Sequence, residues 1–477
     1  MTEQAPSGTI TLIGAGLVGS LLAIFLARRG FDVELYERRP DMRAHAISAG
    51  RSINLAISTR GIHALKKLNL DESILAYAVP MRGRMLHWPT GDLIFQPYGT
   101  DDSEYINSIS RATLNKELMS AAEATGRVRI VFNHRVSGFD FDTNTLLLHD
   151  EDKGVDVRRR VNIAIGTDGS ASAIRHAMER LPGFQSTASE LDYGYKELVI
   201  PPGDGGSFKI EPNALHIWPR GSYMLIALPN FEGSFTCTLF LPWQGEPSFE
   251  KLKNGADVQS FFEGHFADAV PLIENLQQTF EANPTGHMVT VKTKRWNVEG
   301  RVLLMGDAAH GIVPFYGQGM NCGFEDCTVF DDNFDRFRTK DGAVDWAGLF
   351  DFMTRERVPN TDAIADMAVE NFVEMRDKVG DAKFLMQKAV EKILQEKFPG
   401  KYVSRYSLVT FSNVPYALAQ EAGAAQQRML SELCAGLSDA NHVDLVRAEK
   451  LIETIPAPSL STVRSGARIR GEEKHHV

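Results

Sequence analysis

The order of apolar and polar positions predicts a βαβ unit at the start of the chain. From Thr9 the sequence reads TITLIGAGLVGSLLAIFLARRGFDVELYERR. A β-branched run ends at Gly14, an apolar helix is expected from about Leu17 to Arg29, and Gly30 stops it before a second strand, VELYE. Strand, helix and strand in this order form the repeating unit of doubly wound parallel sheets.

Two later segments show the same change from strand to turn to helix. In RVNIAIGTDGSASAIR a strand ends at Gly166, Asp168 opens a turn, and a helix carries Arg175. In RVLLMGDAAH a strand ends at Gly306 and Asp307, and a helix of small residues is expected next. Both segments place an aspartate at the carboxyl end of a strand, where ligands bind in doubly wound sheets.

The region between these two segments has a different pattern. ELDYGYKELVI, ALHIWPRGSYMLIALPN and SFTCTLFLPW are short β-branched and aromatic runs separated by Gly and Pro, and they predict an antiparallel sheet. After Arg355 the glycines become rare, and MQKAVEKILQEKF has apolar residues at the three-four spacing of an amphipathic helix. Further helices are expected between Ala417 and Thr454.

Composition excludes several classes of protein. The 477 residues are 43% hydrophobic and 23% charged, which is ordinary for a soluble globular protein. A net charge of −10 argues against a general nucleic-acid binder, although a few arginines could still bind an anionic small molecule. No window is apolar enough to predict a membrane span, and MTEQAPSGT does not resemble a signal peptide, so a soluble cytoplasmic protein is expected.

The cysteines predict neither disulfides nor a metal site. Four are too few for a disulfide framework in a chain of this length. Cys322 and Cys327 have no His or Cys nearby at metal-ligand spacing, so we expect packed thiols in a reducing compartment and no bound metal.

The first turn carries a dinucleotide-binding pattern. Gly14, Gly16 and Gly19 have the spacing G-x-G-x-x-G between a strand and a helix. The first glycine permits the tight turn, the second lets the backbone approach a pyrophosphate, and the third lets helix and strand pack closely. The helix N-terminus adds N–H groups that favour phosphate. A glycine-rich turn without a ligand is the alternative.

The end of the second strand indicates which dinucleotide is bound. Glu37 follows Gly19 by 18 residues, where a carboxylate can accept a hydrogen bond from the ribose 2′-hydroxyl. Because an acid there disfavours a 2′-phosphate, FAD or NAD is expected and NADP is not. Arg38 and Arg39 are expected to stack on adenine or to reach phosphate.

The glycine turn, the Asp168 turn and the Asp307 turn, taken in this order, resemble the flavoprotein aromatic hydroxylases, which are single-component FAD monooxygenases. A DG or GD turn alone is often only a turn. The resemblance implies that Asp307 binds the flavin ribityl and pyrophosphate groups, and that Asp168 lies by the nucleotide and is linked to NADPH use. No second glycine fingerprint follows a strand, which fits an NADPH that docks only transiently.

Arg111, in SISRATLNKELM, begins another predicted helix. The resemblance implies that its side chain reaches the flavin phosphates or ribityl chain, and a solvated helix-start arginine is the alternative. The resemblance also implies further flavin contacts at Val18, Ala56, Val136, Gly319, Met320 and Asn321.

Further runs narrow the resemblance to members of this family that act on an aryl ketone with an amino-acid tail. These runs are GRSINLAIS (50–58), RGRMLH (82–87), YGYKEL (193–198), LHIWPRG (215–221), MLIALPN (224–230), PFYGQGMN (314–321), ENFVEMRDKV (370–379) and SRYSLVTFS (404–412). The likeness extends from about residue 8 to 415. Position 316 is Tyr where the family motif carries Phe or His, which leaves the exact range of substrates open.

Such a substrate requires a carboxylate clamp and an apolar slot for its ring. Arg84 is the expected clamp because its planar guanidinium suits a carboxylate, and only the motif distinguishes it from Arg82. Tyr98 and Asn371 are expected to bind the same carboxylate, although Asn371 could instead cap its helix or face solvent. The expected ring contacts, each of which could equally be a core residue, are Leu215, Met224, Ile226 and Phe240 on the sheet, Pro314 and Phe315 on the flavin side, and Tyr406 at the far end.

The resemblance implies hydroxylation of the ring. NADPH would reduce FAD, reduced flavin would trap O2 as a C4a-hydroperoxide, and the ring would attack the distal oxygen. No catalytic side chain is then required, and His310 is expected to belong to the flavin helix. The alternatives are a hydroxylase or epoxidase of the same fold acting on another aromatic or isoprenoid substrate, or an FAD protein without oxygenase activity, such as a reductase or a redox-responsive regulator. The oligomeric state is left open, with a homodimer as one option.

We therefore expect an α/β protein with a doubly wound, Rossmann-like FAD-binding domain, an inserted antiparallel substrate sheet and a C-terminal helical region. The FAD-binding domain is expected to be discontinuous, over residues 1–80, 105–185 and 295–350. The substrate domain is expected over 81–104 and 186–294, and the helical region over 351–477.

Overall fold

The computed structural model describes residues 2–4, 8–44, 54–99, 103–374 and 381–456. Residues 50–53 and 375–379 of the quoted runs, and the tail SGARIRGEEKHHV, lie outside the described residues.

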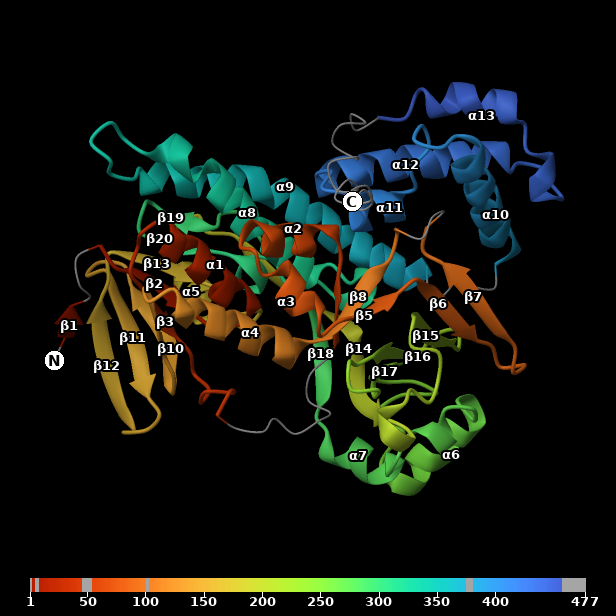
Figure 1. Cartoon of the computed structure of the whole chain (residues 1–477), viewed down its shortest axis with the longest axis horizontal. Helices are drawn as coiled ribbons and strands as arrows, with labels where there is room; N and C mark the ends of the chain where they lie inside the picture. Colours follow the sequence, from red (N-terminus) through yellow and green to blue (C-terminus); the bar gives the residue numbers. More distant parts are fainter. Residues whose placement is uncertain (1, 5–7, 45–53, 100–102, 375–380, 457–477) are drawn as a thin grey trace, which may run out of the picture.

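A six-stranded sheet lies in the half of the molecule that holds the N-terminus (Figure 1). Its order is β19 (Asn297–Val298), β20 (Val302–Leu304), β13 (Ile163–Gly166), β2 (Ile10–Ile13), β3 (Val33–Tyr36) and β9 (Val128–Val131). All neighbouring pairs are parallel except β19 with β20, and this confirms the predicted doubly wound sheet. Its four inner strands, β20, β13, β2 and β3, are fully buried because helices cover them, among them α1 (Leu17–Arg28), α4 (Arg111–Ala124) and α8 (Gly319–Phe334).

Two smaller sheets flank this one. The first consists of β1 (Thr2–Gln4), β12 (Val155–Arg160), β11 (Thr145–Asp150) and β10 (His134–Asp140). The second consists of β4 (Asn54–Ile57), β8 (Ile106–Ser110) and β5 (Val79–Met81). The helices beside them are α2 (Thr59–Lys67), α3 (Asp71–Leu75) and α5 (Ala173–Met178).

A seven-stranded sheet forms the second layer. Its order is β18 (Thr285–Thr293), β14 (Ser186–Ile200), β17 (Phe235–Pro242), β16 (Met224–Pro229), β15 (Ala214–Pro219), β6 (Gly83–His87) and β7 (Leu93–Pro97). The expected antiparallel pairing is wrong at one place, because β6 pairs with β15 in parallel. These two strands come from distant segments, so no hairpin dictates their direction.

The two faces of this sheet belong to different cores. Alternate residues such as Cys237, Leu239 and Leu241 pack on one face against α6 (Gly255–His265) and α7 (Leu276–Ala282). Met224 and Phe240 point to the other face, and their core includes residues of the C-terminal helices. We call this second face the site face. It is formed by every second side chain of β6, β15, β16, β17 and β14. These side chains include Arg84, Leu215, Met224, Ile226, Phe240 and Tyr195.

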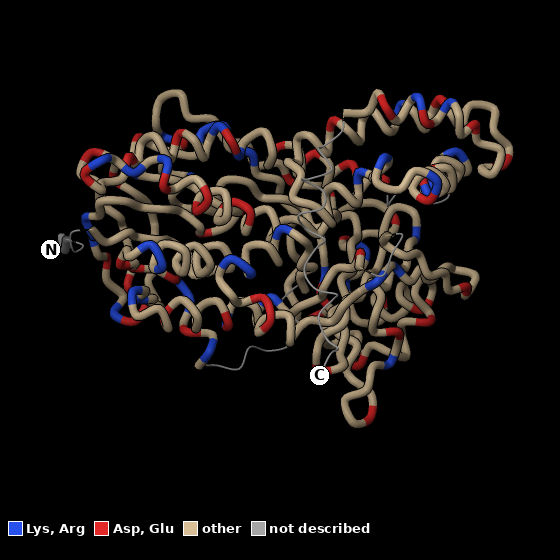
Figure 2. The backbone as a smooth tube through the Cα atoms, turned by 45° about the horizontal axis from the view of Figure 1, so that its top comes forward, with Lys and Arg blue, Asp and Glu red and all other residues tan. Residues whose placement is uncertain are grey.

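The C-terminal helices connect the two layers. Figure 1 shows α9 (Trp346–Val373) running from the six-stranded sheet to α11 (Arg405–Thr410) and α12 (Tyr416–Leu433). α10 (Ala382–Lys397) matches the predicted amphipathic helix, and α13 (Leu445–Ile452) packs on α12. Basic and acidic positions are interspersed along the chain (Figure 2). In the described part of the chain, no helix combines the length and apolarity that crossing a bilayer requires.

Candidate flavin and substrate site

The glycine turn has the geometry that a dinucleotide requires. Gly14 has a φ of +94°, and a Cβ there would lie 2.7 Å from the carbonyl oxygen of Thr167. A Cβ on Gly19 would lie 2.0 Å from the carbonyl oxygen of Gly14, so both positions exclude a side chain. A Cβ on Gly16 would meet no atom within 4 Å, although Gly16 opens α1. This open approach to a helix N-terminus fits a pyrophosphate.

Glu37 follows β3 and reaches back into this turn. Its Oε2 accepts a 3.0 Å hydrogen bond from the backbone N–H of Ala15. Its Oε1 accepts from the backbone N–H and from Nε of Arg39, at 3.0 and 2.8 Å. Arg39 is thus held by Glu37, whereas Arg38 is exposed beside it. The buried carboxylate therefore lies at the fingerprint, as predicted, and already helps to hold the turn.

The two predicted aspartates lie at the carboxyl ends of adjacent parallel strands. The Asp168 Oδ2 accepts a 2.7 Å hydrogen bond from the backbone N–H of Ala173, the first residue of α5, whose N-cap is Ser172. The Asp168 Oδ1 is buried and has no hydrogen-bond partner in the described part of the chain, and burial raises the pKa of this carboxyl. Asp307 is half-buried in a single 3₁₀ turn, Gly306–Ala308.

The helix predicted directly after Asp307 is absent from the described structure, where α8 begins only at Gly319. Gly306 has a φ of +59°, and a Cβ there would lie 2.9 Å from the side chain of Val18 on α1. The Gly306 N–H donates to Oδ2 of Asp326 at 3.0 Å. The His310 N–H donates to the carbonyl of Gly306 at 2.9 Å, so His310 closes this turn and, contrary to the expectation, does not belong to the flavin helix.

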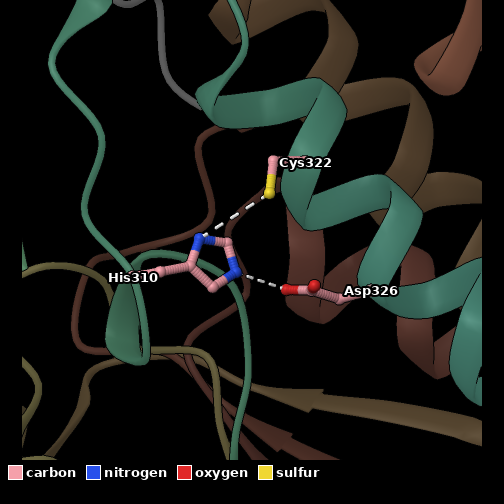
Figure 3. A group of neighbouring side chains, drawn as sticks. All are labelled: His310, Cys322 and Asp326. Carbon is pink, nitrogen blue, oxygen red and sulfur yellow. Dashed lines mark hydrogen bonds and ion pairs between the residues drawn. The ribbon is translucent and has the colours of Figure 1, made fainter. Parts of the chain in front are cut away.

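His310 belongs to a buried charge cluster that sequence spacing did not reveal. Its imidazole points between Cys322 and Asp326 on α8 (Figure 3). The His310 Nε2 lies 2.6 Å from Oδ2 of Asp326, and Nδ1 lies 4.0 Å from Sγ of Cys322. Arg357 on α9 donates from Nε to the second oxygen of Asp326 at 2.8 Å. Only the fold brings these residues together, from a loop and two helices.

An imidazole, a thiol and a carboxylate can bind a metal ion in proteins, but in this cluster the imidazole and the carboxylate are engaged in a buried ion pair. The ligand atoms of His310, Cys322 and Asp326 lie within 4.8 Å of one another. Burial alone would lower the pKa of His310, but the carboxylate of Asp326 raises it well above its ordinary value. The protonated ring has no lone pair to give, and both oxygens of Asp326 already accept hydrogen bonds.

The segment PFYGQGMN ends at the N-terminus of α8. Asn321 is buried, and its Oδ1 accepts from the Ser58 N–H at 2.9 Å. Its Nδ2 donates to the carbonyls of Ala56 and Gly317, at 2.8 and 2.9 Å. Because these bonds engage the side-chain amide, the flavin contacts predicted at Met320 and Asn321 would use backbone N–H groups. Ala56 and Gly319 lie at the same junction, whereas Arg111 is exposed at the start of α4 and Val136 lies on β10.

The predicted carboxylate clamp forms one aromatic and cationic cluster. The rings of Tyr98 and Tyr406 stack with centroids 5.5 Å apart, and the guanidinium carbon of Arg84 lies 5.5 and 5.2 Å from them. The Arg84 Nε and the Tyr98 hydroxyl are buried without a hydrogen-bond partner in the described part of the chain. The guanidinium of Arg82 is exposed and lies over the ring of Tyr105. The geometry therefore separates two arginines that composition could not.

The predicted ring contacts lie on the site face, around this cluster. Leu215 is the cross-strand neighbour of Arg84, and Met224 is that of Phe240. Ile226 lies two residues along from Met224, and its cross-strand neighbours on β15 and β17 are Ile217 and Thr238.

The loop that carries Pro314 and Phe315 packs on the same face. The Phe315 ring lies 5.0 Å from that of Phe240 and stacks at 4.3 Å on Phe372. Asn371 donates a 2.7 Å hydrogen bond to the carbonyl of Phe315, so it holds this loop in place. The unusual Tyr316 is buried and stacks 5.8 Å from Tyr406.

Comparison with known proteins shows the family of this chain. The FAD binding domain family matches residues 8–205 and 271–330. A protein of Myxococcus xanthus named kynurenine 3-monooxygenase is 55% identical over 98% of this chain and 100% of its own length. Another of that name, from Stenotrophomonas maltophilia, is 46% identical over 94% of this chain and 96% of its own length.

Solved structures share the fold at low identity. The tetrameric form of 2-methyl-3-hydroxypyridine-5-carboxylic acid oxygenase has a TM-score of 0.62 and 19% identity, over 79% of this chain and 94% of its own. The p-nitrophenol 4-monooxygenase of Pseudomonas putida has a TM-score of 0.61 and 16% identity, over 90% of this chain and 97% of its own.

Proposed function

The chain belongs to the kynurenine 3-monooxygenase family, and from this premise we propose that it hydroxylates L-kynurenine to 3-hydroxy-L-kynurenine with FAD, NADPH and O2. This is the substrate that the sequence led us to expect, an aryl ketone with an amino-acid tail. The observation that carries the proposal is the Arg84 cluster, in which two buried polar atoms without partners lie beside an apolar sheet face.

FAD would be held along the carboxyl edge of the six-stranded sheet. The N–H groups at the start of α1 would receive the pyrophosphate, Glu37 the ribose, and Asp307 the ribityl chain. Bound FAD supplies the transfer of electrons from NADPH and the activation of O2. The protein's own residues then have to orient the substrate ring and keep water away from it.

The substrate carboxylate would bind at Arg84 and Tyr98. A guanidinium and a phenol both donate hydrogen bonds, and a carboxylate only accepts them. Burial raises the pKa of Tyr98, which keeps its hydroxyl protonated and able to donate. Asn371 would act mainly by holding Phe315, because its Nδ2 already donates to that residue's carbonyl.

The apolar residues of the site face would orient the ring. Phe240, Phe315 and Met224 present a surface without charge, and the C-terminal helices cover it with a shared core. Such a surface excludes water from a reactive oxygen species.

We propose that the chain is divided, as the sequence predicts, into an FAD-binding domain, a substrate sheet and a C-terminal helical region. A homodimer remains a prediction.

The alternative of another aromatic substrate on the same fold is less favoured. Relatives that align over nearly the whole chain share one name. A carboxylate clamp beside a slot of this kind also suits an aromatic amino acid better than an isoprenoid, which has no carboxylate to bind.

The test is NADPH oxidation by the FAD-loaded protein. We expect L-kynurenine to accelerate it, with O2 consumed and a product heavier by one oxygen atom. The matched control is an aromatic acid without the amino-acid tail, such as benzoate, which should have little effect. If an unrelated aromatic acid stimulates oxidation and kynurenine does not, the proposal is wrong.

A further inference from the structure

Glu197 is a carboxylate on the site face that the binding of FAD and of the amino-acid tail leaves unused. On β14 its neighbours Lys196 and Leu198 point the other way: Lys196 Nζ donates to the carbonyl of Asn283, and Leu198 packs in the core with α6 and α7. Side chains alternate along a strand, so Glu197 shares a face with Tyr193 and Tyr195. Both tyrosines belong to the core that also contains Phe240 and Met224.

Thr238 lies directly beside Glu197 and among the proposed ring contacts. It is the cross-strand partner of Glu197 on β14 and of Ile226 on β16. Phe240 is two residues further along the same strand and therefore on the same face. Glu197 and Thr238 thus form a polar pair at one border of an otherwise apolar slot.

Both polar groups of this pair are buried and unsatisfied. Glu197 is 8% exposed and Thr238 is 0% exposed. The Glu197 Oε2 and the Thr238 Oγ1 have no hydrogen-bond partner among the residues that the structure describes. Buried polar groups are nearly always hydrogen-bonded because leaving one unpaired is costly, so two at adjacent positions indicate a ligand that completes them.

The chemistry of the pair selects a hydrogen-bond donor. A carboxylate accepts and, when ionised, cannot donate, and a threonine hydroxyl can do either. Burial raises the pKa of Glu197 to about 7, and Arg111, the charged residue that acts on it, opposes this effect. Glu197 and Arg111 form no ion pair within the described part of the chain, so Arg111 does not replace a ligand.

We propose that Glu197 and Thr238 bind the ring amino group of the substrate, and thereby select ketones with an amino group next to the carbonyl on the ring. This inference rests on the proposed function, which supplies the arylamine. A primary arylamine has two N–H donors and little basicity, which matches one carboxylate and one hydroxyl. Glu197 is in this role a specificity-determining residue and takes no part in oxygen transfer.

Glu197 and Thr238 lie towards the opposite edge of the sheet from the proposed carboxylate clamp at Arg84, at a separation that suits the substrate. In the sheet, β14 and β6 are separated by β17, β16 and β15. The register places Glu197 in line with Leu86, two residues along β6 from Arg84, so with strands about 4.8 Å apart and about 3.4 Å per residue the backbones at Glu197 and Arg84 are about 20 Å apart. Two long side chains and an aromatic amino acid between them span such a distance, with the tail at Arg84 and the ring amine at Glu197.

The test compares two ligands on four proteins loaded with FAD. The ligands are L-kynurenine and its desamino analogue, in which hydrogen replaces the ring amino group. The proteins are the unchanged chain, Glu197→Leu, Thr238→Val and the control Glu190→Leu, which makes the same change at an exposed position on β14. Dissociation constants are measured from the change in flavin absorbance.

We expect the unchanged protein and Glu190→Leu to prefer kynurenine over the analogue by about 10-fold, the effect of one charge-assisted hydrogen bond. Glu197→Leu should remove most of this preference by weakening kynurenine alone, and Thr238→Val should remove part of it. Equal weakening of both ligands, or an unchanged preference in both variants, overturns the inference.

Acidity provides a second readout. Kynurenine should bind more tightly as pH rises from 6 to 8 and Glu197 ionises, and the analogue should not. Tyr195, the neighbouring titratable group on this face of β14, does not titrate in this range, since burial raises its pKa above its ordinary value. If the unchanged protein binds no kynurenine at all, the proposed function fails; if it binds kynurenine without dependence on Glu197, only this inference fails.

Discussion

Asp326 and His310 form a fully buried ion pair, with 2.6 Å between the carboxylate Oδ2 and the imidazole Nε2. The same carboxylate oxygen accepts from the N–H of Gly306, one residue before Asp307. The pair therefore ties α8 to the turn on which the predicted ribityl ligand lies. A buried ion pair of this kind holds geometry, because either partner alone would be an uncompensated charge in the core.

Replacing Asp326 by Asn should destabilise the protein and loosen FAD. The change leaves His310 without its counter-charge, while Arg357 keeps its ion pair with Glu325, and breaking a buried pair in this way costs about 3–5 kcal/mol. Thermal unfolding and the dissociation constant of FAD measure the two effects. The control is Asp332→Asn on the same helix, at an exposed pair with Lys67, which should change stability by under about 1 kcal/mol. Equal stability of the two variants would contradict the assignment.

The free energy of unfolding should fall in mild acid because of two buried histidines that lie side by side, His87 and His216. Burial lowers the pKa of His216 to about 4, and it also lowers the pKa of His87, whose Nε2 lies 2.8 Å from Nδ1 of His216. Below about pH 6.5 these two histidines bind protons in the unfolded chain but not in the folded chain. Their contribution to the free energy of unfolding is therefore fully present above about pH 6.5 and is lost as the pH falls towards 4. For His216 alone the loss is at most about 3 kcal/mol.

The measurement is chemical denaturation between pH 7.5 and 4.5. His216→Gln should flatten the decline, because the group that the unfolded chain protonates is gone. The exposed His442 is the matched control, and His442→Gln should keep the full slope. A decline of the same size in His216→Gln would show that other groups cause it.

Replacing Arg84 by Met should weaken kynurenine binding and leave FAD in place. Loss of a charge-assisted pair costs about 1.5–3 kcal/mol, or about 10- to 150-fold in affinity. Titration of the holoenzyme with kynurenine measures this, and the flavin content of the purified protein is the second readout. Arg82→Met should match the unchanged protein, since its side chain lies over Tyr105. Flavin loss with normal kynurenine binding would rule out the clamp.

Glu37→Gln should have the opposite effect. The amide keeps the shape of the side chain but loses the negative charge. The carboxylate oxygens of Glu37 accept hydrogen bonds from Ala15 and Arg39, and these bonds are weakened. We expect FAD affinity to fall by about 10-fold, the lower end of the effect of a charged hydrogen bond. Kynurenine binding to the fully loaded enzyme should be unchanged. Tight FAD retention in this variant would mean that the carboxylate serves only the turn.

The glycine turn and Glu37 could be predicted from the sequence because most of their interactions are local. Gly14 and Gly19 are required by contacts of the turn with itself and with Thr167, and Glu37 acts within the same βαβ unit. The contacts of Gly19 with Gly14 and of Glu37 with Ala15 lie within one βαβ unit, so spacing reveals them, whereas the contact of the turn with Thr167 depends on the pairing of β2 with β13. The β-branched and aromatic runs likewise predicted β14, β15, β16 and β17 of the second sheet, but not the parallel pairing of β6 with β15, which depends on where two distant segments meet.

Residue spacing and periodicity predict the doubly wound fold and the dinucleotide turn, and a motif match favours Arg84 over Arg82 as the clamp. Packing adds the burial of Arg84 between two tyrosines and the exposure of Arg82, brings Asp326 to His310 and places Glu197 beside Thr238. These features could not be predicted because burial and the absence of a partner are properties of packing between elements. A polar residue is the same in the sequence whether water or a ligand completes its hydrogen bonds, and the fold decides which.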